Sequence, residues 1–285
     1  MSVVSCLRPD PAALAEEWRS LVEAEYAQVE RLREFRDDDH YAPIAHHFAD
    51  DPHRSGDPLL DALRAASRPD MTWVDIGAGG GRYALPLALV SRQVLAVEPS
   101  EGMRQVLRES AATHGIENVR VLAHRWPEGA AEVVADASLV AHVGYDIRDI
   151  ARFVDAVERV TRERCYWVLM DRAPSSGFTR LWEQVHGEPR QQLPGMREFL
   201  VYLLARGATP NVRMFVRQGW QIPVDELPEN ARRRLWLAPG SEKDQLLQRL
   251  LARELASGTT DWDFPSVVAL LDWEPRRAGG RGAGA

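Results

Sequence analysis

Lysine is almost absent from this sequence, because Lys243 is the only one among 285 residues and arginine supplies the other basic side chains. A Schiff-base lysine or the lysine of a phosphate-binding loop would have to be Lys243, and no glycine-rich loop precedes it. The sequence therefore argues against both chemistries. Cysteine is nearly as rare. Cys6 lies near the N-terminus and Cys165 in an apolar strand-like run, so neither a disulfide framework nor a cysteine zinc site is indicated.

The sequence also has no long apolar run and no excess of basic residues. Acidic residues outnumber basic ones by 42 to 35, giving a net charge of -7, which argues against a large phosphate-binding surface. No apolar stretch approaches the roughly 18 residues of a membrane span, and the N-terminal residues lack the pattern of a signal peptide. We therefore expect a cytoplasmic protein that binds small molecules, with neither nucleic acid nor membrane among its partners.

What the sequence does contain is a regular alternation of short apolar runs and helical stretches over residues 71–171. This alternation is typical of a parallel sheet with crossover helices. Two later apolar runs suit antiparallel strands added at the sheet edge. The pattern predicts an α/β fold with a doubly wound, mostly parallel, seven-stranded sheet. The expected strands are Thr72 to Ile76, Gln93 to Val97, Val119 to Ala123, Ala137 to His142, Cys165 to Asp171, Val212 to Ile222 and Ser266 to Trp273.

Further elements are expected before, within and after this core. Residues 1–68 are predicted to form an N-terminal helical cap and residues 69–175 a ligand-binding core. Residues 176–275 would complete the sheet and carry a helical lid insertion, while residues 276–285, rich in Gly, Ala and Arg, are predicted to be disordered. The expected helices are Pro11 to Arg36, Leu59 to Ala66, Tyr83 to Val90, Gly102 to His114, Ile147 to Val160, Phe178 to His186, Met196 to Arg206 and an insert from Asp225 to Ser257.

The first predicted strand runs directly into a glycine-rich turn. Glycines lack the Cβ atoms that would keep a ligand away from the backbone, and a helix follows the turn. A dinucleotide fingerprint would need its third glycine at position 82, which is Arg82. An NAD-dependent oxidoreductase is therefore disfavoured, although it stays an alternative. The turn is Val74-Asp75-Ile76-Gly77-Ala78-Gly79-Gly80-Gly81.

This spacing, with an acid two residues before the first glycine, resembles motif I of the class I S-adenosylmethionine-dependent methyltransferases over about residues 71–171. The resemblance implies a Rossmann-like methyltransferase fold with S-adenosyl-L-methionine as cofactor. It also implies in-line methyl transfer with S-adenosyl-L-homocysteine as product. Within the turn, the implied cofactor contacts are Asp75, Gly77, Ala78, Gly79 and Gly81.

More cofactor contacts are expected at the ends of the next two strands. Glu98 ends the second strand, where its carboxylate can accept hydrogen bonds from both ribose hydroxyls. Met103 resembles the apolar residue that packs against adenine. After the third strand the family commonly has an aspartate, from which this chain departs: His124, Arg125 or a backbone amide replaces that contact, and Trp126 offers a stacking face. The cofactor-binding candidates here are Glu98, Pro99, Met103, Arg125 and Trp126.

The fourth strand ends at His142, where related enzymes present residues to the sulfonium and the acceptor. A histidine poised near neutrality suits a base for an oxygen or nitrogen acceptor. His142 is therefore the first catalytic candidate and also a candidate cofactor contact. Tyr145 and His186 are the other catalytic candidates. Tyr41, in the N-terminal cap, is a candidate for closing over the cofactor.

The histidines and acids of the N-terminal segment show no ordered ligand spacing, so no metal site is predicted. The loop after the fourth strand lacks the Asn-Pro-Pro-Tyr pattern of the family's nucleic-acid and protein-amide branches. We therefore expect a small-molecule acceptor, methylated on oxygen or nitrogen in a covered pocket. A non-catalytic S-adenosylmethionine-binding or regulatory protein is the main alternative. Aminopropyl transfer is disfavoured because no paired aspartates follow the fourth strand.

Overall fold

The computed structural model describes residues 9–36, 50–216, 222–259 and 261–276. Its strands are β1 (Thr72–Ile76), β2 (Gln93–Val97), β3 (Val119–Leu122), β4 (Ala135–Ala141), β5 (Thr161–Met170), β6 (Asn211–Val216) and β7 (Val267–Trp273). Its α-helices are α2 (Pro11–Leu32), α3 (Pro58–Ala66), α4 (Ala84–Ala88), α5 (Glu101–Thr113), α6 (Ile150–Val160), α7 (Thr179–His186), α8 (Met196–Ala205), α9 (Leu227–Arg234) and α10 (Glu242–Ala256). Short 3-10 turns lie at η2 (Ala130–Glu132) and η3 (Pro174–Ser176).

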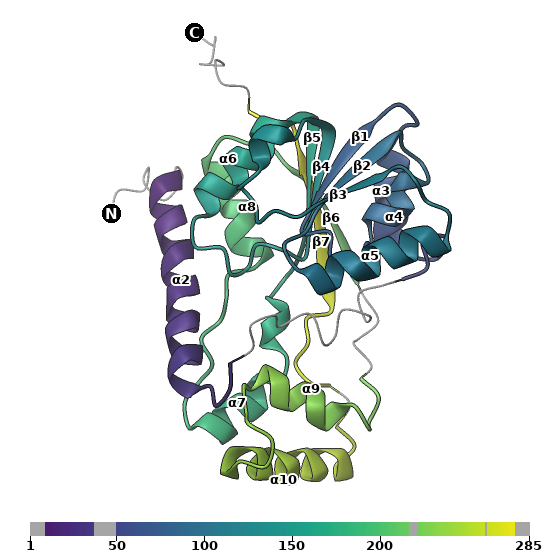
Figure 1. Ribbon diagram of the computed structural model, residues 1–285. Coiled ribbons are helices and arrows are strands. Elements are labelled where there is room, and N and C mark those ends of the chain that lie inside the picture. Colours follow the sequence, from purple (N-terminus) through teal and green to yellow (C-terminus); the bar gives the residue numbers. More distant parts are fainter. Residues whose placement is uncertain (1–8, 37–49, 217–221, 260, 277–285) are drawn as a thin grey trace.

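The strands form one sheet in the order β3-β2-β1-β4-β5-β7-β6 (Figure 1). Strands β1 to β5 run parallel, while β7 pairs antiparallel with both β5 and β6. β1 is buried along its whole length, as expected for a parallel strand covered on both faces. The predicted seven-stranded, mostly parallel α/β fold is confirmed. The carboxyl ends of β1 to β5 therefore meet at one edge of the sheet, which we call the carboxyl edge.

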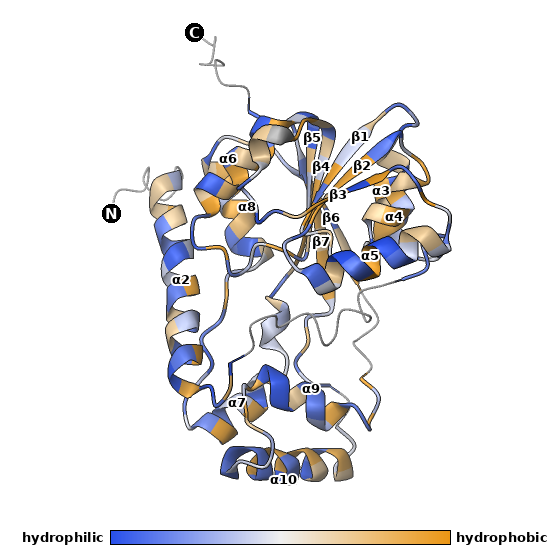
Figure 2. Cartoon of the chain, in the orientation of Figure 1, coloured by the Kyte–Doolittle hydropathy of each residue, from blue (hydrophilic) through white to orange (hydrophobic). Residues whose placement is uncertain are grey.

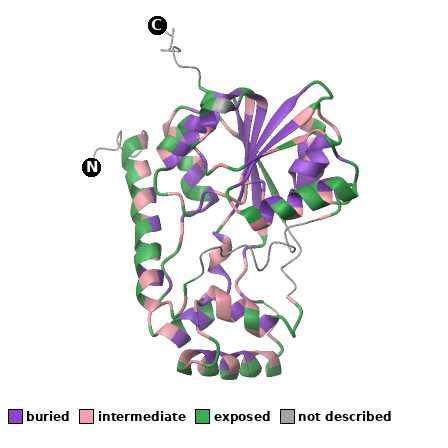
Figure 3. Ribbon diagram, viewed as in Figure 1, coloured by how far each residue is buried: buried purple, intermediate pink, exposed green. Residues whose placement is uncertain are grey.

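Helices α6 and α8 cover one face of the sheet, with α2 packed against them, and α3, α4 and α5 cover the other face (Figure 1). Apolar residues concentrate on the strands (Figure 2), which are also the most deeply buried part of the chain (Figure 3). On the first face, the ring centroid of Trp167 lies 4.3 Å from that of Phe199 and 5.5 Å from that of Phe153. Because aromatic side chains bury large apolar areas, this cluster holds α6 and α8 on the sheet.

Three more helices stand opposite the carboxyl edge (Figure 1). We call α7, α9 and α10 the helical subdomain, because they share a separate apolar core. Helix α2 joins it to the sheet. Near the sheet, Trp18 Nε1 donates to the Ile147 carbonyl at 2.8 Å. Just past the other end of α2, the Glu34 N–H donates to the Trp236 carbonyl at 2.9 Å. Contacts at both ends of α2 therefore fix the position of the subdomain.

Some elements differ from the sequence-based expectation. β5 begins at Thr161 rather than Cys165, because its polar first residues find a partner: Arg164 Nη1 lies 2.6 Å from Asp272 Oδ2 on β7. The insert after residue 225 is two helices, interrupted where Trp236 takes a φ of +59°. Residues 277–285 of the predicted tail lie outside the described residues. Among the described helices, none has the length and apolar character that a bilayer span requires.

Candidate active site

The glycine turn lies over the carboxyl end of β2. The N–H groups of Gly77 and Ala78 both donate to the Val97 carbonyl, at 2.8 and 3.2 Å, and so anchor the turn on the neighbouring strand. The φ angles of Gly77, Gly79 and Gly81 are +75°, +54° and +90°. Residues with a Cβ atom rarely adopt such angles. The turn is therefore held in a conformation that favours glycine.

The three glycines differ in what surrounds them. A Cβ on Gly77 would lie 2.5 Å from Val143 Cγ2, and one on Gly81 would lie 2.9 Å from Leu85 Cγ. A Cβ on Gly79 would have no heavy atom of the described chain nearer than 3.9 Å. Packing therefore requires glycine at the first and third positions. The backbone at Gly79 instead leaves room for a ligand to approach.

Glu98 lies beside the turn and is only 7% exposed. Its Oε2 accepts the Gly79 N–H at 2.9 Å, and its Oε1 accepts the Ser100 N–H at 2.8 Å. Each oxygen of a carboxylate offers two lone-pair sites, so these backbone bonds do not exhaust the acceptor capacity of the group. The structure thus brings Glu98 and the turn together, where the carboxylate can also accept from hydroxyl donors such as those of a ribose.

Asp75 lies on β1 just before the turn and is almost fully buried. Burial, and then the charge of Glu98, raise the pKa of Asp75 to about 7, while a hydrogen bond from the Ala84 N–H acts in the opposite direction. Its Oδ1 has no hydrogen-bond partner within the described ranges. With this pKa, Asp75 is partly protonated near neutral pH, and a positively charged ligand such as a sulfonium would favour its ionised form.

The residues expected around adenine are only partly gathered at the turn. Met103 is buried at the start of α5, and its sulfur is the nearest atom to the open side of Gly79. Pro99 is exposed, and its carbonyl accepts a hydrogen bond from Arg104 Nη1 at 2.6 Å. The structure therefore brings Met103 to the turn and uses the Pro99 carbonyl to hold α5.

The two candidates after β3 have different surroundings. Arg125 is exposed. Trp126 is 7% exposed and belongs to the apolar cluster on the α6 face of the sheet, together with Leu122 and Val133. Core side chains therefore enclose the Trp126 ring. This burial does not support the predicted stacking of Trp126 on adenine.

His142 follows β4 directly and lies beside the turn. Its N–H donates to the Val168 carbonyl at 2.9 Å, and its φ is +57°. Such backbone conformations cost free energy in residues with a Cβ atom, and they cluster at functional sites. The His142 ring is half-buried, with its centroid 6.4 Å from that of Tyr83. The structure thus brings the first catalytic candidate to the predicted cofactor site.

Tyr145 is buried, and its hydroxyl is engaged. The hydroxyl oxygen accepts the Met170 N–H at 2.8 Å, which ties the loop after β4 to the end of β5. Burial raises the pKa of Tyr145 above its usual range, and the nearby charge of Asp171 adds to this. A buried phenol that resists ionisation is poorly suited to act as a base. The structure therefore indicates a structural role for Tyr145 and does not support the predicted catalytic one.

His186 lies at the end of α7, in the helical subdomain. Its Nε2 is 3.0 Å from the Leu235 carbonyl oxygen and its Nδ1 is 3.3 Å from Lys243 Nζ, while its ring lies 4.3 Å from that of Trp182. Burial lowers the pKa of His186. These contacts join α7 to α9 and α10, so the structure does not bring His186 to the turn or support its predicted catalytic role. Tyr41 lies outside the described residues.

Asp171 is a site residue that the sequence-based reasoning missed. It comes directly after β5 and so lies at the same edge as the glycine turn and His142. Its N–H donates to the Val267 carbonyl at 3.1 Å. The residue is partly exposed, but its Oδ1 is buried and has no hydrogen-bond partner among residues that the structure describes. An acid at the end of a parallel strand was the available signal, because ligands bind at that edge.

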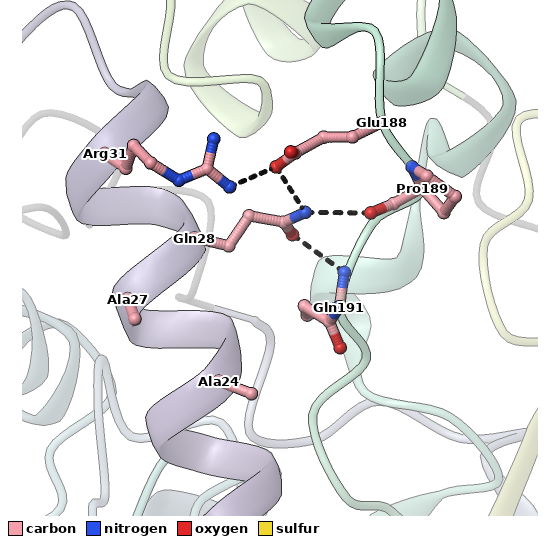
Figure 4. Close-up of a pocket in the computed structure, with 7 residues that line it drawn as sticks. All are labelled: Ala24, Ala27, Gln28, Arg31, Glu188, Pro189 and Gln191. Atoms are coloured by element: carbon pink, nitrogen blue, oxygen red, sulfur yellow. Dashed lines mark hydrogen bonds and ion pairs between the residues drawn. The ribbon is translucent and has the colours of Figure 1, made fainter.

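A groove of about 460 Å³ lies between α2 and the segment that follows α7 (Figure 4). Both the amide nitrogen and the amide oxygen of Gln28 form hydrogen bonds there. Its Nε2 donates to Glu188 Oε1 and the Pro189 carbonyl, and its Oε1 accepts the Gln191 N–H. The residues that line the groove include neither the turn nor the residues after β4 and β5. We therefore interpret the groove as part of the packing of α2.

Solved structures with this architecture cover most of the chain. The YcgJ protein of Bacillus subtilis is 17% identical, with a TM-score of 0.53 over 77% of this chain and 98% of its own. An S-adenosylmethionine-dependent methyltransferase from Geobacter sulfurreducens, in complex with S-adenosylhomocysteine, is 14% identical, with a TM-score of 0.54 over 82% and 98%. YjhP of E. coli is 12% identical, with a TM-score of 0.55 over 83% and 99%. At these identities the likeness shows the fold alone.

The sequence itself matches a known domain family. A family model described as a methyltransferase domain matches residues 74–169, a range that contains the glycine turn, Glu98 and His142. No curated protein matches the chain. The matched range coincides with the strands whose carboxyl ends form the glycine-lined site. Over residues 74–169 the chain is therefore similar to methyltransferase domains, and a structure that shares its fold was solved with S-adenosylhomocysteine bound.

Proposed function

We propose that the chain is a class I S-adenosylmethionine-dependent methyltransferase. Its methyl acceptor would be a small molecule, methylated on oxygen or nitrogen, that binds between the carboxyl edge of the sheet and the helical subdomain. The observation that carries this proposal is the position of α7, α9 and α10 opposite that edge (Figure 1). Helix α2 adds contacts along one side, through Trp18 near the sheet and Glu34 near the subdomain. A macromolecular acceptor would have to reach the turn past these helices, which favours a small molecule.

The charge of the site supports a small acceptor over a nucleic acid. The chain carries a net charge of -7, and Asp75, Glu98 and Asp171 lie at or near the carboxyl edge. Carboxylates repel the phosphates that dominate nucleic-acid affinity. An uncharged or positively charged small molecule meets no such repulsion. The cytoplasmic location expected from the sequence stays a prediction.

The cofactor contacts are proposed from the geometry of the turn. The backbone at Gly77, Ala78, Gly79 and Gly81 would form the floor of the cofactor site, and Glu98 would accept the ribose hydroxyls. Asp75, Met103 and His142 are the other candidates beside the turn. Pro99, Arg125 and Trp126 are retained as candidates from the sequence, and Tyr41 lies outside the described residues. S-adenosylmethionine, when bound, supplies a methyl group on a positively charged sulfur. A cation at this position would favour the ionised form of Asp75.

We propose that His142 is the base that removes a proton from the acceptor. It lies at the end of β4 beside the turn, and an imidazole can take a proton from an oxygen or nitrogen nucleophile near neutral pH. His142→Ala should therefore lower turnover by roughly 100-fold or more while changing the affinity for S-adenosylhomocysteine little. Steady-state rates and calorimetric titration would measure the two effects. An equal loss in both would indicate a binding role instead.

A turnover screen tests the small-molecule proposal directly. The purified protein would be incubated with S-adenosylmethionine and a panel of phenols, catechols and amines, with folded RNA as a separate substrate. Release of S-adenosylhomocysteine would be measured for each. We expect release with at least one small molecule and none with RNA. Methylation of RNA alone would contradict the proposal.

A further inference from the structure

Asp171 is an acid at the active-site edge with no assigned role. Its backbone is fixed on both sides. The Asp171 N–H donates to the Val267 carbonyl of β7 at 3.1 Å. Gly195 packs closely on the other side, since a Cβ there would lie only 2.8 Å from the Asp171 carbonyl oxygen. The preceding residue, Met170, donates its N–H to the Tyr145 hydroxyl. The carboxylate is therefore carried on a rigid backbone, as a group that must orient a ligand should be.

The side chain of Asp171 lacks the partner that a buried acid normally has. Within the described ranges, its Oδ1 is buried without a hydrogen bond, and no arginine, lysine or histidine forms an ion pair with it. Its neighbour Arg172 donates instead to the Asp263 carbonyl at 3.1 Å. A buried acceptor without a donor costs about 1–3 kcal/mol. The residue as a whole is partly exposed, which leaves part of it within reach of a ligand that could supply a donor.

We propose that Asp171 binds the methyl acceptor and that the acceptor is an amine; this rests on the proposed small-molecule function. An ionised carboxylate only accepts hydrogen bonds, so the group that it binds must carry an N–H or O–H. No cation pairs with the Asp171 carboxylate within the described ranges, so it favours an acceptor whose methylated atom carries a positive charge after the reaction. That atom is a nitrogen, because an ether oxygen formed from an alcohol carries no charge.

The charge balance of the reaction agrees with this assignment. The lone pair of a neutral amine forms the new N–C bond, while the electron pair of the broken S–C bond stays with sulfur as the neutral thioether. The positive charge thus moves to nitrogen, and the extra proton then passes to His142, the proposed base. The Asp171 carboxylate accepts the N–H hydrogen bond and stabilises the charge as it develops on nitrogen.

The test uses binding, so that it does not depend on turnover. Calorimetry would first compare S-adenosylhomocysteine binding to the wild type, Asp171→Asn and Asp171→Ala, with Asp146→Asn as a control that removes one exposed charge from the neighbouring loop. We expect affinities within about 3-fold of each other, because Asp171 is not proposed to hold the cofactor. If the wild type does not bind S-adenosylhomocysteine, the methyltransferase function itself fails, which separates that failure from failure of this inference.

The protein loaded with S-adenosylhomocysteine would then be titrated with ethylamine, butylamine and benzylamine, and with ethanol, butanol and benzyl alcohol, using ligand-observed NMR. We expect at least one amine to bind about 10-fold more tightly than its alcohol. This preference should fall below about 3-fold in Asp171→Asn and persist in Asp146→Asn. Equal binding of amine and alcohol, no binding of any amine, or an amine preference retained in Asp171→Asn would each overturn the proposal.

Discussion

The buried acid pair at the glycine turn should make the stability of the unliganded protein depend on pH. Asp75 is about 1% exposed, and its pKa is raised from 3.8 to about 7 by burial and then by the charge of Glu98. The folded protein therefore holds this proton over a pH range in which the unfolded chain has lost it. Stability then falls as the pH rises. The contribution is fully present below pH 3.8 and is lost by about pH 7.

Substitution of Asp75 by asparagine isolates this effect. The interval from 3.8 to about 7 spans about three pH units, and each unit corresponds to about 1.4 kcal/mol. The asparagine side chain cannot ionise, and its carbonyl oxygen can still accept the Ala84 N–H. Asp75→Asn should therefore match the wild type near pH 4 and exceed its free energy of unfolding by up to about 4 kcal/mol above pH 7.

Urea unfolding followed by tryptophan fluorescence at several pH values would measure this difference. Asp70→Asn is the matched control, because Asp70 lies two residues before β1 with its side chain 82% exposed. We expect the control to keep the wild-type pH dependence. Parallel stability curves for the wild type and Asp75→Asn would refute the reasoning, because they would mean that Asp75 has the same pKa in the folded and unfolded states.

Three further variants test other features. Glu98→Ala should weaken S-adenosylhomocysteine binding by roughly 1.5–3 kcal/mol per lost charged hydrogen bond, and unchanged affinity in calorimetry would exclude Glu98 as the ribose ligand. Gly81→Ala should lower the free energy of unfolding by about 1–3 kcal/mol, because the new Cβ would lie 2.9 Å from Leu85 Cγ at a φ of +90°; a stable variant would show that the turn can relax. Glu158→Ala removes a buried carboxylate 2.9 Å from Arg206 Nη2 and should cost about 3–5 kcal/mol, whereas a loss below about 1 kcal/mol in denaturant unfolding would indicate that water replaces the pair.

The predictions that succeeded concern residues close together in the sequence. β1 and β2 have the predicted bounds, because continuous apolar runs between turn residues specify buried parallel strands. The mostly parallel, seven-stranded sheet also follows the alternation of elements. The start of β5 was missed because Arg164 finds its partner Asp272 more than 100 residues later. The local sequence around Arg164 does not predict a pairing with so distant a residue.

The sequence by itself determined the fold class, the glycine turn and the acid at the end of β2, because a strand, a turn and the next helix restrict one another over a few residues. Only the tertiary structure decided which candidates face the site. Tyr145 is engaged by Met170, 25 residues away, and His186 by Leu235, 49 residues away. Asp171, by contrast, has a buried oxygen without a partner among the described residues. Burial and hydrogen-bond satisfaction depend on packing between distant segments, so residue type and spacing alone could not distinguish these roles.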